Sequence, residues 1–162
     1  MDASLRVLDR LVHSVSRRGA HVAYLGAGEH PVRMRILGPE ALGPGREGSV
    51  RLFLPRPLPL LPGDRFVLRE SGRSETVGGG CILDVDPREQ ASRARPDRSV
   101  DRVVRERGWV GSDELERLTG ERREPDVGQW VVDPEALQTT LAGLREALDE
   151  SGPLGVELSS LD

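Results

Sequence analysis

The chain has 162 residues and a net charge of −4, and each of its 23 basic side chains is an arginine. Because lysine is absent, a phosphate-binding loop of the G-x-x-x-x-G-K-[ST] type is excluded. The single cysteine, Cys81, excludes an intrachain disulfide and a cysteine metal cluster. Residues 1–96 hold 15 arginines against 11 acidic residues, whereas residues 97–162 hold 8 against 16, so only the first half should attract phosphate backbones.

The first half of the chain has the pattern of short strands separated by turns. Residues 5–15 fit a helical face and a strand almost equally well, so periodicity leaves this segment open. Loops are expected at residues 16–19 and 38–48, and a stiff proline-rich connection follows residue 54. Strands are predicted over residues 21–25, 32–37 and 49–54. Such spacing is typical of a small antiparallel barrel or sandwich.

The stretch from Leu60 to Asp86 predicts a turn followed by two strands. Residues 62–64 (PGD) form a turn signal, and residues 65–70 alternate polar and apolar like a half-buried strand. A second strand begins at Ser74, and three glycines at 78–80 are expected to interrupt it before it resumes at Cys81. Glycines inside a strand indicate a bulge, a bend at a barrel corner, or a backbone that another molecule approaches closely.

These segments carry a resemblance to a known family. GDRFVLRE and SETVGGG, followed by an apolar strand that ends in Asp, resemble the third domain of translation elongation factors related to elongation factor Tu. The bacterial selenocysteine-specific elongation factor is the most similar of these, and the upstream runs AHVAYLG, VRMRIL and RLFLPRPLP resemble the same domain. The resemblance implies an antiparallel β-barrel over residues 1–87, with a first strand near Leu5.

The second half of the chain changes to a helical pattern. Residues 88–96 are polar and read as a linker. A helix over 97–107 has Asp97 or Ser99 as a plausible N-cap. Further elements are expected over Ser112–Gly120 (helix), Gln129–Val132 (strand) and Pro134–Ser151 (helix). In the first of these helices Ser112 would be the N-cap and Gly120 the C-terminal stop. We expect Leu137, Leu141, Leu144 and Leu148 to face inward.

This order of elements predicts a winged-helix module over residues 97–162. RERGWVGSDELERLTG and GQWVVDPEALQTTL resemble the first such module of the same family, and the end, GPLGVELSSLD, resembles the start of another. Its candidate recognition helix, Ser112–Gly120, is acidic, so a phosphate backbone should repel it. We therefore expect a spacer or protein-contact unit and no DNA partner.

Two groups of residues are candidates for RNA binding. In the resembled family, the third barrel contacts backbone phosphates and 2′-hydroxyls of a charged tRNA, a task for arginines and main-chain NH groups. By this resemblance, the first group would be Arg69, Arg73, Gly78, Gly79 and Gly80. A second basic cluster consists of Arg17, Arg18 and His21, in an unknown position relative to the first. Solvated surface arginines are an equally good interpretation of each one taken singly.

Catalysis has little support in the sequence. No nucleophile partners His13, His21 or His30 at a recognisable motif, so we predict neither a catalytic residue nor a metal site. The resemblance implies GTP and Mg²⁺ only for a GTPase domain, whose motifs this chain does not show. No run of 18 apolar residues and no signal-peptide pattern is present, so a soluble cytoplasmic protein without membrane partners is expected.

The resemblance as a whole implies a non-catalytic, tRNA-binding portion of a selenocysteine-specific elongation factor. Its partners would be selenocysteinyl-tRNA, the ribosome and the GTPase portion of the factor. The alternative is a standalone protein-interaction module, in which the barrel is a docking surface and RNA has no role.

Overall fold

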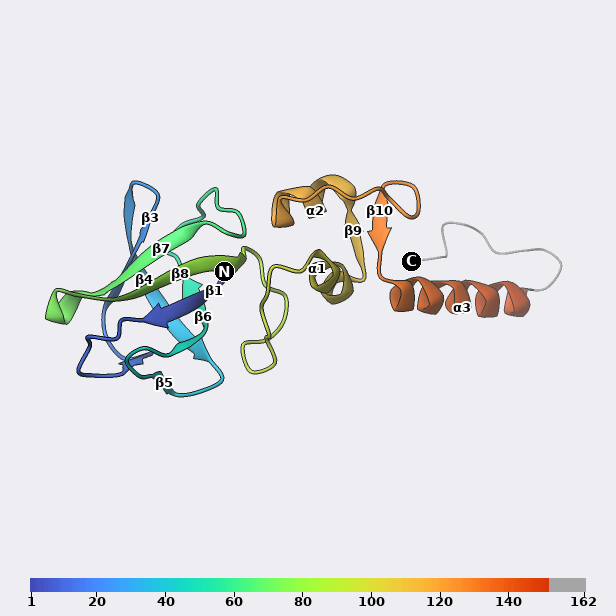
Figure 1. Cartoon of the computed structure of the whole chain (residues 1–162). Helices are drawn as coiled ribbons and strands as arrows, with labels where there is room; N and C mark the ends of the chain where they lie inside the picture. Colours follow the sequence, from blue (N-terminus) through green and yellow to red (C-terminus); the bar gives the residue numbers. More distant parts are fainter. Residues whose placement is uncertain (152–162) are drawn as a thin grey trace.

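The structure, a computed structural model, describes residues 1–151. Figure 1 shows a barrel of strands, a small helical unit beside it, and a last helix that projects away from both. The barrel strands are β1 (Asp2–Val7), β3 (His21–Leu25), β4 (Gly28–Leu37), β6 (Glu47–Phe53), β7 (Arg65–Glu70) and β8 (Glu75–Asp84). They close in the order β1-β6-β4-β3-β7-β8, and every neighbouring pair is antiparallel. The predicted barrel, and its first strand near Leu5, are thereby confirmed.

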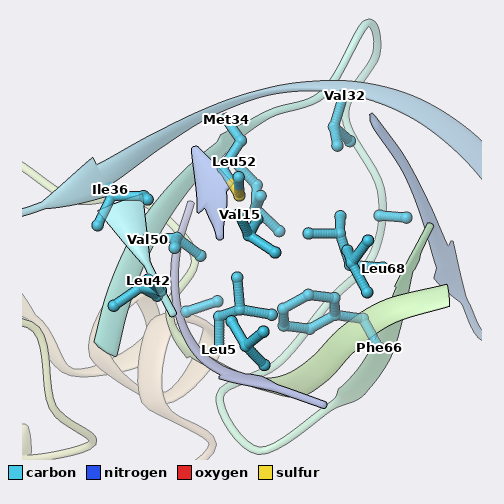
Figure 2. Packing of buried hydrophobic residues seen from close by; sticks show 14 of the residues in the cluster. Leu5, Val15, Val32, Met34, Ile36, Leu42, Val50, Leu52, Phe66 and Leu68 are labelled. Atoms are coloured by element: carbon cyan, nitrogen blue, oxygen red, sulfur yellow. The ribbon is translucent and has the colours of Figure 1, made fainter. Parts of the chain in front are cut away.

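The barrel core is built from the alternating apolar positions of these strands. In β7, Phe66 and Leu68 are 3% and 0% exposed, whereas Val67 between them is 46% exposed, because successive side chains of a strand point to opposite faces. Figure 2 shows Leu5, Val50, Leu52 and the other core side chains converging inside the barrel from strands far apart in the sequence. Burial of this apolar surface is the main force that closes the barrel.

Two short segments in or next to the expected loops also contribute to the fold. Val15–Ser16 and Ala41–Leu42 form the short strands β2 and β5, which pair with each other in a separate two-stranded sheet. Val15 and Leu42 are 2% and 4% exposed. The pairing therefore pins two glycine-containing loops onto one end of the core.

The glycine run does not interrupt its strand. β8 is continuous from Glu75 to Asp84, and the expected break at Gly78–Gly80 was wrong. The irregularity is a register shift with β7 between Leu68 and Arg69, which is a β-bulge of the kind that three glycines indicate. Backbone pairing with β7 on one side and β1 on the other holds the glycines in the sheet.

The helical unit follows residues 88–96, which contain no helix or strand. It comprises α1 (Val100–Arg107), β9 (Trp109–Gly111), α2 (Ser112–Thr119) and β10 (Trp130–Val132), with β9 and β10 paired. Ser99 caps α1, since its Oγ accepts a hydrogen bond from the Arg102 backbone N at 3.3 Å. Gly120 ends α2 in the left-handed conformation, as predicted. Ser112 was expected to cap α2, but it is the first helical residue, and its hydroxyl donates to the Arg123 carbonyl oxygen.

The last helix, α3 (Pro134–Ser151), starts at Pro134 as predicted but packs differently from the prediction. None of its residues is buried, and Leu141 and Leu148 are 37% and 54% exposed. The expectation that the leucine stripe faces a core was wrong, because α3 projects away from the unit and all four leucines are half-buried or exposed. The winged-helix assignment stays a prediction, and the proposed start of a further unit lies outside the described residues. Within residues 1–151, no helix has the length and apolar character needed to cross a bilayer.

The barrel and the helical unit are joined by the ion pairs of two largely buried arginines. The guanidinium of Arg102 in α1 lies 2.9 Å from the carboxylate of Asp84 at the end of β8, 2.9 Å from Asp97 and 2.8 Å from Glu106. Burial alone would lower the pKa of Arg102, but the hydrogen bonds and charges of Glu106, Asp84 and Asp97 outweigh it and raise that pKa. Beside it, Arg107 contacts the Asp86 carboxylate at 3.1 Å. The boundaries of the predicted domains at 87 and 97 stay predictions.

Candidate nucleic-acid interface

The turn between β7 and β8 presents the first group of candidate arginines. A single 3₁₀ turn, η1 (Ser71–Arg73), closes this hairpin, followed by Ser74 with a positive φ of 50°. Arg69 is half-buried, and its Nη2 donates to the Ser74 carbonyl oxygen at 2.9 Å. The Arg73 side chain is 57% exposed, with its Nε 3.5 Å from a carboxylate oxygen of Glu70. Arg69 therefore stabilises the turn, while Arg73, although paired with Glu70, is exposed enough to reach a ligand.

The second cluster lies at the same end of the barrel. β3 pairs with β7 so that His21 is opposite Glu70, and the Ser71 N–H donates to the Ala20 carbonyl oxygen at 2.8 Å. Arg17 and Arg18 are exposed in the loop that enters β3. The side chain of His21 is different, since the residue is only 3% exposed and lies inside the barrel end. The structure thus brings the two arginine groups together, which the sequence left open.

Glu70 is the acidic centre of this end. Its carboxylate lies 3.3 Å from His13 Nε2 and 3.5 Å from Arg73 Nε. Burial lowers the pKa of His21, and the negative charge of Glu70 opposes that effect only in part. Glu70 therefore offsets some of the positive charge of Arg73, whereas Arg17 and Arg18 form no ion pair among the described residues.

The glycine run has a structural explanation within the barrel. A Cβ added to Gly78 would overlap the Arg6 carbonyl oxygen, and one added to Gly80 would overlap that of Ser4. At Gly79 the added atom would lie 2.7 Å from the Phe66 carbonyl oxygen. The molecule that approaches these glycines closely is the chain itself, through β1 and β7. Contact of Gly78, Gly79 and Gly80 with RNA stays a prediction.

A groove beside the second cluster was missed by the sequence analysis. It has a volume of about 760 Å³ and lies over β3, β4 and the end of β6, with Arg17, Pro31, Arg33, Phe53 and Pro55 among its lining residues. A neighbouring hollow of about 440 Å³ shares Arg17 and adds Arg18, Arg35 and Glu40. The alternation of Arg33 and Arg35 was a signal for an exposed strand face. The proximity of Arg33 to Phe53 depends on the pairing of β4 with β6, which the sequence did not reveal.

The three histidines lie in two places. His13 and His21 are near Glu70, whereas His30 is 6% exposed at the start of β4, with its ring against Gly28. Within residues 1–151, no three histidine, cysteine or acidic side chains are grouped so that they could hold a metal ion.

Comparison with known proteins agrees with this barrel. The family model for the β-barrel domain of the selenocysteine-specific elongation factor matches residues 8–89, a little over half of the chain. A solved structure of bacterial selenocysteine-specific elongation factor EF-Sec superposes with a TM-score of 0.62 at 13% identity. The match covers 98% of this chain but only 28% of the EF-Sec chain. A search of curated proteins gave no match. The chain therefore belongs to the family of the selenocysteine-specific elongation factor β-barrel domain.

Proposed function

We propose that this chain is a non-catalytic, tRNA-binding part of a selenocysteine-specific elongation factor. Its barrel would contact the backbone of selenocysteinyl-tRNA in the cytoplasm, together with the ribosome and a GTPase portion. Family membership supports the general role in selenocysteine incorporation. The observation that supports RNA binding is the arrangement of three exposed arginines at one end of the barrel. Arg17 and Arg18 come from the loop before β3, and Arg73 comes from the turn between β7 and β8.

Phosphate recognition fits the chemistry of this end better than base reading does. Arginines on loops of a rigid barrel can pair with phosphates of a duplex stem whose bases are stacked inside. Arg69 would act mainly by holding the turn, since its Nη2 is engaged with Ser74. This division of roles makes Arg73 the stronger contact of its pair.

The helical unit would serve as a spacer. Its helix α2 carries Asp113, Glu114 and Glu116 against Arg117, so its surface repels a phosphate backbone. Arg102 and Arg107 fix α1 against the end of β8, so the unit has a defined direction relative to the barrel. A unit held in this way can set the distance to a partner without binding RNA itself.

Salt-dependent binding of selenocysteine tRNA to the full chain tests the proposal. Fluorescence anisotropy would measure the affinity of the wild type, of Arg17→Glu plus Arg18→Glu, and of Arg69→Glu plus Arg73→Glu. Each arginine that pairs with a phosphate should contribute about 1 to the slope of log K against log salt concentration. We expect both double variants to weaken binding and to reduce this slope.

A matched control separates local contacts from net charge. Arg105→Glu plus Arg117→Glu changes the charge of the chain by the same amount at exposed positions of the helical unit. We expect it to leave the salt slope nearly unchanged. Equal losses of RNA affinity in all three double variants would mean that only the net charge of the chain matters. This would contradict the proposal that the arginines at the barrel end contact the RNA. No RNA binding by the intact chain would favour the protein-interaction alternative.

A further inference from the structure

The groove over β3, β4 and β6 has an exposed aromatic ring as its main feature. Phe53, the last residue of β6, is 43% exposed, whereas the only other phenylalanine, Phe66, is 3% exposed in the core. The Arg33 guanidinium carbon lies 5.4 Å from the centroid of the Phe53 ring, directly across the β4–β6 pair. Pro31 and Pro55 also line the groove. The result is a small apolar platform with a planar cation above it.

The charge around this platform is positive and unpaired. Arg17 and Arg33 line the groove, and Arg18 and Arg35 line the adjoining hollow. Among residues 1–151, these four arginines form no ion pair with a carboxylate, unlike Arg51 and Arg102 elsewhere. One carboxylate, that of Glu40, lines the hollow but not the groove. An anionic ligand with an aromatic part would match both properties of the site.

We propose that this groove binds an unpaired nucleotide of the RNA, with its base stacked on Phe53 or on the Arg33 guanidinium and its phosphate paired with Arg17. Bases stack on aromatic rings and on guanidinium planes only when they are free of the duplex, so the platform selects a single-stranded segment. A second copy docked groove to groove is a poor occupant, because its own arginines would be placed against these. The proposal rests on the proposed function and specifies which part of the RNA reaches this face.

The groove lies within reach of an RNA held at the barrel end. Cross-strand register places Arg69, Val22 and Pro31 in one row, and Arg33 is two residues further along β4 than Pro31. Two strand spacings and two residue rises put the Cα atoms of Arg69 and Arg33 about 12 Å apart. A duplex stem at the arginine loops and an unpaired segment in the groove can therefore belong to one RNA molecule.

The test compares two RNA hairpins of equal stem, one blunt and one with a short single-stranded tail that carries 2-aminopurine. Anisotropy with the full chain measures affinity, and quenching of 2-aminopurine reports stacking. We expect the wild type to prefer the tailed hairpin and to quench its fluorophore. Phe53→Ala and Phe53→Leu should both reduce affinity for the tailed hairpin by about 5- to 150-fold, the range for loss of one stacked base. Binding of the blunt hairpin should not change.

Two control variants sharpen the result. Phe53→Tyr keeps an aromatic face and should keep both preference and quenching. Val67→Ala trims an apolar residue that is 46% exposed outside the groove, and it should have no effect. Equal affinity of the wild type for both hairpins would overturn the nucleotide site while leaving the proposed function intact. Failure to bind either hairpin would overturn both. A concentration-dependent dimer that Phe53→Ala abolishes would assign the groove to a second copy instead.

Discussion

Arg102 offers the strongest test of how the barrel and the helical unit are joined. Replacing it with alanine removes the cation shared by Asp84, Asp97 and Glu106. The side chains of Asp84 and Glu106 are 4% and 14% exposed, so two nearly buried carboxylates would lose the positive charge that neutralises them. Removing one partner of a buried ion pair costs about 3–5 kcal/mol, a large part of the roughly 5–15 kcal/mol that stabilises a typical domain.

The chain has a convenient probe for this experiment. Both tryptophans, Trp109 and Trp130, lie in the helical unit, so their fluorescence follows that unit while far-UV circular dichroism follows the whole chain. We expect Arg102→Ala to lower the tryptophan-detected melting temperature by at least about 6 °C. The helical unit, followed by fluorescence, should also melt at a lower temperature than the barrel, followed by circular dichroism. Arg105→Ala, an exposed change on the same helix, is the matched control. A shift no larger than that of the control would refute the reasoning, as would additive effects of Arg102→Ala and Asp84→Ala.

Three further predictions concern the barrel and the last helix. Gly80→Ala should destabilise the barrel by about 1–3 kcal/mol, because its Cβ would overlap the Ser4 carbonyl oxygen. Gly72→Ala, where the Cβ meets nothing within 4 Å, should be neutral or slightly stabilising in the same urea titration. Because burial lowers the pKa of His21 below its unfolded value of about 6.5, the unfolded state takes up the proton first. The stabilising contribution of neutral His21 is therefore complete above pH 6.5 and is lost as the pH falls below it. We expect His21→Gln to make the melting temperature less dependent on pH in melts from about pH 7.5 downward. The same pH dependence in His21→Gln and the wild type would contradict this prediction. Leu141→Gln plus Leu148→Gln should change the free energy of unfolding by less than about 0.5 kcal/mol per site, and a larger loss would show that the stripe is covered.

Local pattern predicted most of the fold where one face of an element is buried. Residues 65–70 alternate, and the structure buries Phe66 and Leu68 while exposing Val67. The pattern misled in α3, where leucines at helical spacing looked like a core face although none of them is buried. Periodicity reports that a face is apolar, but the partner that covers it is a property of tertiary packing. The glycine run misled for a similar reason, because β8 is held as a strand by β1 and β7, which are distant in sequence.

The candidate site was predictable as a set of residues but not as a surface. Arginines 17 and 18 belong with Arg73 only because β3 pairs with β7, which sets His21 opposite Glu70. The Phe53 platform likewise depends on its register with Arg33. A shift of one residue in either pairing would turn these side chains to the other face of the sheet. Register is a long-range property, and the sequence offered no measure of it.

The opposite charges of the two halves can coexist because the fold separates them. The turn that carries Arg73 begins β8, and the ion pair of Asp84 with Arg102 lies at the other end of that strand. Ten residues of strand span about 30 Å, nearly four times the Debye length of about 8 Å at physiological ionic strength. The acidic helical unit therefore contributes little potential at this turn, and RNA can approach it without repulsion from α2. The separation holds only while the Arg102 contacts keep the unit at the far end. Loosening them should weaken RNA binding, most strongly at low salt where charges are least screened, because the acidic unit could then swing toward the basic end.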